Sequence, residues 1–214
     1  MEKMTSHQVK NEYLNAMGEE NGELFHHLSS EFAWIYVLWN EYKIIFREKN
    51  YDILNKTAPG FFRIIKRQFI HDIVLGMCRI NDPKESMGNK NLSIKRLVDI
   101  AKKGHRKNIK ERLNEIDEKI CNIKKYRHKI ISHNDLETNL KKTASPQVKF
   151  EEIESCLFEI NELLNYFKSL YGMPNTLYKR TKTSSGHSAA LIAYLDIAKR
   201  VREKPNKWQM ENGF

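Results

Sequence analysis

Apolar residues recur along this chain at alternating steps of three and four, the spacing of amphipathic α-helices that pack against one another. One such stripe is rich in aromatic side chains and consists of Phe25, Leu28, Phe32, Ile35, Trp39, Tyr42 and Phe46. A second consists of Ile109, Leu113, Ile116, Ile120 and Ile123, and a third of Phe150, Ile153, Leu157, Ile160, Leu164, Phe167 and Tyr171. No stretch alternates as a half-buried strand would, so each stripe predicts a helix.

The helix expected at about 60–81 differs from the others because it is apolar on two sides. Phe62, Ile65, Phe69, Ile73 and Ile80 lie on one side, and Phe61, Ile64, Val74 and Met77 lie towards the other. Such a helix belongs at the centre of a bundle. We therefore expect Phe69 to be deeply buried, together with Trp39 of the aromatic stripe.

Shorter patterns predict helices at about 6–17, 93–103 and 188–204, while the second stripe predicts one long helix at about 105–134. Ser145–Pro146 is a typical start for the helix of the third stripe. The pattern as a whole predicts an all-α fold, an up-and-down helical bundle with extra N- and C-terminal helices. We expect the bundle over residues 1–172, and a basic loop with a C-terminal helix and tail over 173–214.

The composition adds a strong positive charge to this picture. In 214 residues, 37 Lys and Arg stand against 27 Asp and Glu, a formal net charge of +10. Such an excess favours a phosphate-bearing partner, although a solvated surface explains it equally well. Cys78, Cys121 and Cys156 form no CxxC pair and are expected in the core. No apolar run approaches the length of a membrane span, so we expect a cytoplasmic protein without a membrane partner.

The candidate chemistry lies where the second stripe meets a charged residue. The position after Ile123 on that stripe is Arg127, and a guanidinium on the core side of a helix is costly unless it pairs or faces a cleft. One interpretation is a core-edge arginine paired with Asp82 or Asp72. The other is a phosphate-binding arginine, since His128 and His133 follow within two turns and His transfers protons at neutral pH.

The spacing of Arg127 and His133 sets a geometric condition on such a site. On a straight α-helix six residues correspond to a rotation of about 240°, so the two side chains would not share a face. Either the helix ends near Ile131 and His133 turns inward, or two protomers share the site.

The order Arg127, His128, four further residues and His133 resembles the signature of the HEPN superfamily, which reads Arg, a polar residue, a short spacer and His. Leu38–Tyr42, the run that ends in Arg79–Asp82, and Asn91–Ile94 resemble its abortive-infection, AbiU-type branch. This resemblance covers roughly residues 15–170. It implies a homodimer in which two motifs meet at a two-fold interface.

The resemblance also implies metal-independent RNA cleavage, in which the 2′-hydroxyl attacks the adjacent phosphate. His133 would act as general base or acid, Arg127 would stabilise charge on the phosphorane, and His128 would orient the phosphate. Asn134, taken to lie on the Arg127 face, would add a hydrogen bond. Arg79 and Asp82 are candidate supporting residues. Family toxins silenced by nucleotidylation carry a tyrosine two residues after the motif His, where this chain has Asp135.

Basic residues on the motif helix provide a candidate track for RNA. They are Lys124, Lys125, Lys129 and Arg106. A charge run is usually a solvated helix face, but this one lies on the element that carries the motif. We expect no metal and no other cofactor, because His26–His27 and His71–Asp72 lack ligand spacing and no nucleotide-binding motif is present.

Two other functions stay open at this point. A HEPN domain can bind nucleic acid or a partner protein without cutting, and a helical scaffold would leave Arg127 inert against an internal carboxylate. The expected partners are RNA, a second copy of the chain and a cognate antitoxin protein.

Overall fold

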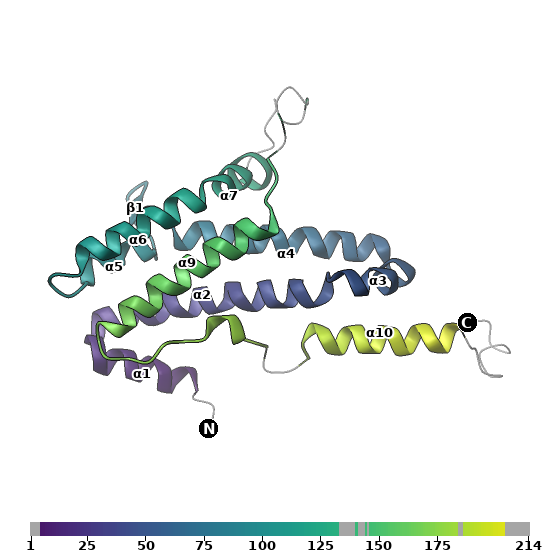
Figure 1. Ribbon diagram of the computed structural model, residues 1–214, viewed down its shortest axis with the longest axis horizontal. Helices are drawn as coiled ribbons and strands as arrows, with labels where there is room; N and C mark the ends of the chain where they lie inside the picture. The colour runs from purple at the N-terminus through teal and green to yellow at the C-terminus, as the bar shows by residue number, and fades with distance from the viewer. Residues whose placement is uncertain (1–4, 133–139, 141–143, 145, 184–185, 204–214) are drawn as a thin grey trace.

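The computed structural model describes residues 5–132, 140, 144, 146–183 and 186–203, and over them the chain is a bundle of helices with one short hairpin (Figure 1). The predicted all-α bundle is confirmed. The first half contains α1 (Ser6–Met17), α2 (Glu19–Ile45), η1 (Glu48–Asn50), α3 (Tyr51–Thr57), α4 (Pro59–Ile80), β1 (Glu85–Ser86) and β2 (Asn89–Lys90). The second half contains η2 (Ile94–Arg96), α5 (Leu97–Ile100), α6 (Arg106–Lys119), α7 (Cys121–Tyr126), the π-helix η3 (Arg127–Ser132), α9 (Phe150–Ser169), η4 (Tyr178–Arg180) and α10 (Ser188–Glu203).

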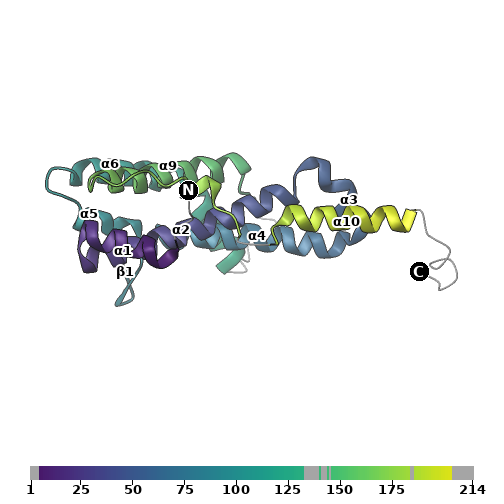
Figure 2. The ribbon, with the colours of Figure 1, turned by 90° about the horizontal axis from the view of Figure 1, so that it is seen from below.

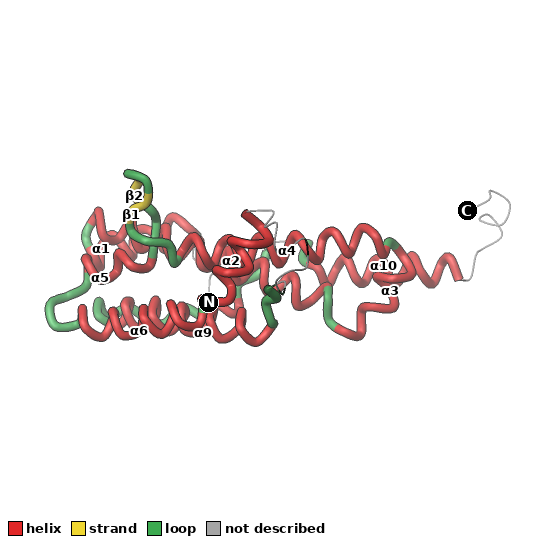
Figure 3. The backbone as a smooth tube through the Cα atoms, turned by 90° about the horizontal axis from the view of Figure 1, so that it is seen from above, coloured by secondary structure: helices red, strands yellow, loops and turns green. Residues whose placement is uncertain are grey.

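The helices form two layers, which Figures 2 and 3 show edge-on. α6 and α9 pack together in one layer, and α1, α2 and α4 make up the other. The crossing of α2 and α4 is close because Gly76 has no side chain: a Cβ there would lie 2.9 Å from Cγ1 of Ile35. Gly22 does the same for the crossing of α1 and α2, where a Cβ would lie 2.5 Å from the Tyr13 carbonyl oxygen.

Several element predictions need correction. The helix predicted at 105–134 breaks at Ile120 into α6 and α7 and then becomes the π-helix η3. The helix of the third stripe begins at Phe150 and not after Ser145–Pro146, and the Lys149 N–H donates to Glu152 Oε2 at 2.8 Å at this start. Helix α3 and the hairpin β1–β2 were not predicted, because segments this short carry no readable period.

The core follows the stripes with two exceptions. Trp39 is buried as predicted, and its ring stacks on Tyr42 with centroids 5.5 Å apart. Phe69 is only partly buried, because it lies where the main core meets a smaller cluster of α2, α3 and α4. Cys78 and Cys156 are buried, whereas Cys121 is exposed because it lies between the inward-facing Ile120 and Ile123.

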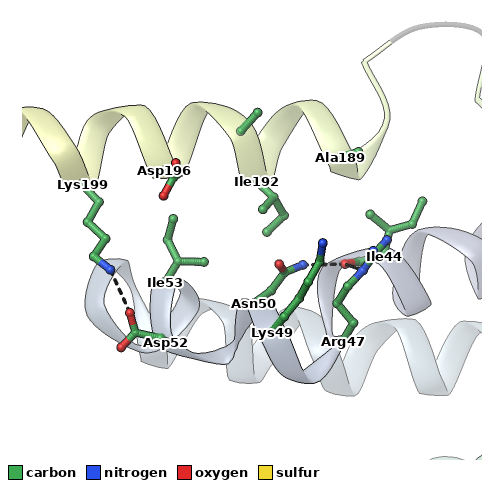
Figure 4. A pocket seen from close by; sticks show the side chains of 11 residues that line it. Ile44, Arg47, Lys49, Asn50, Asp52, Ile53, Ala189, Ile192, Asp196 and Lys199 are labelled. Carbon is green, nitrogen blue, oxygen red and sulfur yellow. Dashed lines mark hydrogen bonds and ion pairs between the residues drawn. The ribbon is translucent and has the colours of Figure 1, made fainter.

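The chain after α9 returns along the bundle before it reaches α10. Tyr178 of η4 enters the main core, and α10 then packs against the α2–α3 end of the molecule. Figure 4 shows this contact, in which Lys199 donates to Asp52 at 2.8 Å beside a cavity of about 420 Å³. No helix among the described residues is both long and apolar enough to cross a membrane.

Candidate functional site

The candidate motif begins where α7 passes into the π-helix η3, which packs against α4. A π-helix closes i→i+5 hydrogen bonds and therefore turns less per residue than an α-helix, and such turns are frequent at functional sites. The rotation of about 240° expected between Arg127 and His133 assumed a straight α-helix, and that premise is wrong over Arg127–Ser132. The placement of Asn134 on the Arg127 face rested on the same assumption. His133 and Asn134 themselves lie outside the described residues.

Arg127 pairs with Asp82, which lies two residues after the end of α4. Its Nη1 donates to Asp82 Oδ1 at 3.0 Å, and the two side chains are 30% and 28% exposed. Of the two carboxylates considered for Arg127, Asp82 is therefore the partner. The contact uses one of the five N–H donors of the guanidinium. The pair is reachable from solvent, unlike an ion pair sealed in a core.

A cavity of about 300 Å³ borders this pair on its α4 side. It is lined by Glu31, Arg79, Ile80, Asp82, Asn91 and Leu92. Arg79 lies on its wall, with Nη2 3.9 Å from Glu31 Oε2. Of the residues that the sequence indicated, Arg127 and Asp82 are thus in direct contact, and Arg79 shares the wall of this cavity with Asp82.

A polar network that was not predicted lies next to the pair. Asp117 of α6 accepts hydrogen bonds from Asn81 Nδ2 at 2.8 Å, Lys95 Nζ at 2.9 Å and Lys124 Nζ at 3.2 Å. Burial raises the pKa of Asp117, but the hydrogen bonds from Lys95 and Asn81 and the charge of Lys124 outweigh it and leave the pKa below its usual value. Lys124, expected to bind RNA, is therefore held by an acidic side chain. Asn81 could have drawn notice, since it directly precedes Asp82.

The remaining predicted residues are spread more widely. Lys125 and His128 are exposed on α7 and η3, and Lys129 is partly buried. Arg106 begins α6, whose 14 residues correspond to a length of roughly 20 Å, and donates to the Asp99 carbonyl oxygen at 3.2 Å. Figure 1 shows this start of α6 at the far end from α7, so Arg106 is not brought to the motif.

Two further groups near the motif were not singled out as parts of the site. His71 of α4 contacts the ring of Tyr126, the residue before Arg127, with centroids 6.1 Å apart. Its Nε2 is buried without a hydrogen-bond partner among the described residues, and burial lowers its pKa. Cys78 is buried close enough to feel the charge of Arg127, but burial raises its pKa to about 11, so it stays a thiol and is no nucleophile.

Within the described ranges, no group of three or more His, Cys, Asp or Glu side chains gathers as a metal site would require. The arrangement that stands out is therefore a partly exposed ion pair, Arg127–Asp82, beside a small cavity. His128 follows Arg127 in the chain, and His71 contacts the preceding residue, Tyr126.

Comparison with protein families gives one match over most of the chain. The model HEPN_AbiU2, described as AbiU2, matches residues 18–188, from the turn before α2 to the first residue of α10. The matched range contains all the groups of the candidate site. No curated protein matches the chain. No solved structure matches it either.

Proposed function

This chain belongs to the AbiU2 family of HEPN domains, and we propose that it is a metal-independent endoribonuclease that acts in abortive infection. The observation that carries the proposal is the Arg127–Asp82 pair, partly exposed at the edge of a cavity. A planar guanidinium can donate hydrogen bonds to two phosphate oxygens at once. A phosphate that displaced Asp82 would therefore be bound by two parallel hydrogen bonds from Arg127.

In the proposed reaction the 2′-oxygen forms a bond to phosphorus and the bond from phosphorus to the 5′-oxygen breaks. A general base takes the proton of the 2′-hydroxyl, and a general acid gives a proton to the leaving 5′-oxygen. The products are a 2′,3′-cyclic phosphate and a 5′-hydroxyl. His133 is assigned to proton transfer, Arg127 to the charge that grows on the phosphorane, and His128 to orienting the phosphate.

We further propose that two copies of the chain share the site. Ile64, His71 and Leu75 follow one another along α4 at steps of seven and four and so share one face of that helix, and Asp82 lies two residues beyond its end. The C-terminal part of this face meets Tyr126 and Arg127, but Ile64 and the nearby Phe61 are 55% and 57% exposed. A second copy on this face would cover apolar surface and bring two motifs together. The basic surface would attract RNA, and a cognate antitoxin remains a prediction.

A second function is favoured by the same ion pair. An arginine that only holds η3 to the end of α4 would also pair with Asp82, and a domain of this kind would bind RNA or a protein without cutting. The two functions differ in what happens when the histidine is removed.

The test is cleavage of a labelled single-stranded RNA in the presence of EDTA. We expect the wild type to leave a 2′,3′-cyclic phosphate, and His133→Ala to lose cleavage but keep RNA binding, since a proton shuttle adds little to ground-state affinity. Arg127→Ala should weaken both. His27→Ala, which removes an exposed imidazole on α2, is the matched control and should cleave normally. Equal cleavage by His133→Ala and the wild type would refute the assignment, and binding without cleavage by the wild type would favour the second function.

The dimer has a test of its own. Ile64→Glu places a charge on the exposed face of α4, whereas Glu151→Lys changes the charge of an exposed position on α9. We expect the mass from light scattering to fall from dimer to monomer for the first variant only. A wild type that stays monomeric at tens of micromolar would refute the shared site.

A further inference from the structure

A second polar cavity lies on the side of the bundle away from α7, where α1, α2 and the end of α9 meet the return segment (Pro174–Thr181). Its volume is about 590 Å³, within the range of roughly 300–1,000 Å³ typical of small-molecule sites. Figure 1 shows the return segment running beside α1 and α2. The proposed ribonuclease site uses none of its lining residues.

The group that marks this cavity is Lys168 of α9. The residue lines the cavity and is only 5% exposed, and its Nζ donates to Thr176 Oγ1 at 2.6 Å. Its ammonium also lies 5.5 Å from the centroid of the Tyr13 ring. No carboxylate among the described residues forms a salt bridge with it, and burial lowers its pKa although Glu12 acts in the opposite direction. Lysines are almost never this buried without an anionic partner.

Other polar groups also line this cavity, and their arrangement suits a polar ligand. Nδ1 of His26 is buried and has no hydrogen-bond partner among the described residues, and burial lowers the pKa of this imidazole. Ser29 Oγ lies 2.6 Å from the Tyr178 hydroxyl and 3.4 Å from that of Tyr13, so a chain of hydroxyls lines the cavity. Arg180 adds a second cation on the lining, against the single carboxylate of Glu12.

The wall formed by the return segment is fixed in place. Asn165 donates from Nδ2 to the Thr176 carbonyl oxygen at 3.2 Å and accepts from the Thr176 N–H at 2.7 Å. Asn40 donates to the carbonyl oxygens of Lys179 and Thr181 at 3.1 and 3.0 Å. With both ends of the segment held, the cavity is formed without a ligand, so binding would involve little ordering of the chain.

We propose that this cavity binds a phosphate monoester of about the size of a mononucleotide. Its oxygens would accept from Lys168, Arg180 and the hydroxyl groups, and it would give the buried ammonium an anionic partner, which no side chain among the described residues provides through a salt bridge. A phosphate fits better than a carboxylate, because the donors come from several elements and a phosphate has three strong acceptor oxygens. The monoester could be a free nucleotide or the terminal phosphate of an RNA chain.

The test is calorimetric titration of the full chain at constant ionic strength with four probes: inorganic phosphate, a 5′-mononucleotide, and a short DNA oligonucleotide with and without a 5′-phosphate. DNA lacks the 2′-hydroxyl, so the proposed cleavage cannot consume it. We expect saturable binding of the mononucleotide, weakened about tenfold or more by Lys168→Met. Lys179→Met, an exposed lysine that does not line the cavity, is the matched control and should bind normally.

The outcomes separate cleanly. Binding of the 5′-phosphorylated but not the 5′-hydroxyl oligonucleotide would identify a chain end, and binding of the mononucleotide alone would identify a free nucleotide. No saturable binding of any probe by the wild type, or equal binding by Lys168→Met, would refute the proposal. Should Lys168→Met fail to fold, Arg180→Gln on the exposed part of the lining provides the same comparison with an expected loss of affinity. None of these readouts depends on RNA cleavage, so the two proposals can fail separately.

Discussion

Replacing Asp82 by Asn would remove the charge that Arg127 now faces, and the consequences can be worked out from the ion pair. Exposed pairs contribute about 0–1 kcal/mol, and breaking a fully buried pair costs about 3–5 kcal/mol. With 30% and 28% exposure this pair lies between these limits, so we expect Asp82→Asn to lower the free energy of unfolding by about 1–2 kcal/mol. Urea denaturation measures this loss as a fall in the midpoint concentration of urea while the slope of the free energy of unfolding against urea stays the same.

The same substitution should have the opposite effect on RNA. If a phosphate must displace Asp82 from Arg127, removing this competitor should tighten RNA binding by up to the same 1–2 kcal/mol, a factor of about 5–30. Asp196→Asn makes the same change in net charge on α10, where Asp196 pairs with Arg200, and corrects for the general electrostatic gain. Two results would refute competition for the guanidinium. The RNA affinity of Asp82→Asn could fall as it does in Arg127→Ala, or it could rise no more than that of the control Asp196→Asn.

Three other perturbations test the fold and the network beside the motif. Trp39→Ala should cost about 3–5 kcal/mol if the buried site cannot collapse, and an unchanged melting midpoint would contradict its place in the core. Gly22→Ala should destabilise the chain because the new Cβ would meet the Tyr13 backbone at 2.5 Å, whereas Gly60→Ala, which meets nothing within 4 Å, should be stabilising by about 0.5–1 kcal/mol in the same melting experiment. Asp117 has a lowered pKa in the folded state, so it stabilises the fold above its unfolded-state pKa and that contribution is lost as pH falls through its folded-state pKa. Asp117→Asn should therefore flatten the acid limb of the stability–pH curve, and an unchanged acid limb would contradict the hydrogen bonds assigned to this carboxylate.

The helices could be predicted from spacing, but the breaks between them could not. Ile116, Ile120 and Ile123 are all buried and keep the three–four steps, so nothing in the pattern marks the end of α6. Neither Gly nor Pro lies at the break, and Ile120 keeps right-handed helical backbone angles of φ −81° and ψ −6°. A small backbone change of this kind is decided by tertiary packing, which a single sequence does not display.

The π-helix explains why the faces of the residues after Arg127 could not be predicted, whereas Arg127 itself still follows the α-helical turn from Ile123. Extending the stripe beyond Arg127 assumes 3.6 residues per turn, but a π-helix turns less per residue than an α-helix. None of the residues in η3 is fully buried: Arg127, Lys129, Ile130 and Ile131 are partly buried, and His128 and Ser132 are exposed. A change from i→i+4 to i→i+5 hydrogen bonds cannot be recognised in the hydrophobic pattern of a segment as short as the 6 residues of η3. The amino acids of the motif were therefore identifiable, but their orientation was not.

The partner of Arg127 shows a second limit of the same kind. Asp72 lies within the central helix α4 and Asp82 two residues beyond its end, and only the register of α7 and η3 against α4 selects Asp82, 45 residues away. The Asp117 network escaped notice for the same reason, because Asn81, Lys95 and Lys124 come from separate elements. Contacts between helices depend on which turns lie opposite one another, and periodicity gives the face of a helix but not its axial position.

The two cations on which the proposals rest present opposite electrostatic situations. Arg127 already has an acidic partner, so an RNA phosphate must compete with Asp82, and its affinity should respond to the removal of that carboxylate. Lys168 is more deeply buried and has no acidic partner among the described residues, so an anion there would fill a place that no side chain holds. Because a buried ammonium without an anion is costly, Lys168→Met should stabilise the ligand-free chain even as it abolishes the proposed phosphate site. If the Lys168 ammonium served only to hold Thr176 through its hydrogen bond, the Met variant would instead be less stable than the wild type, and phosphate binding would be unchanged.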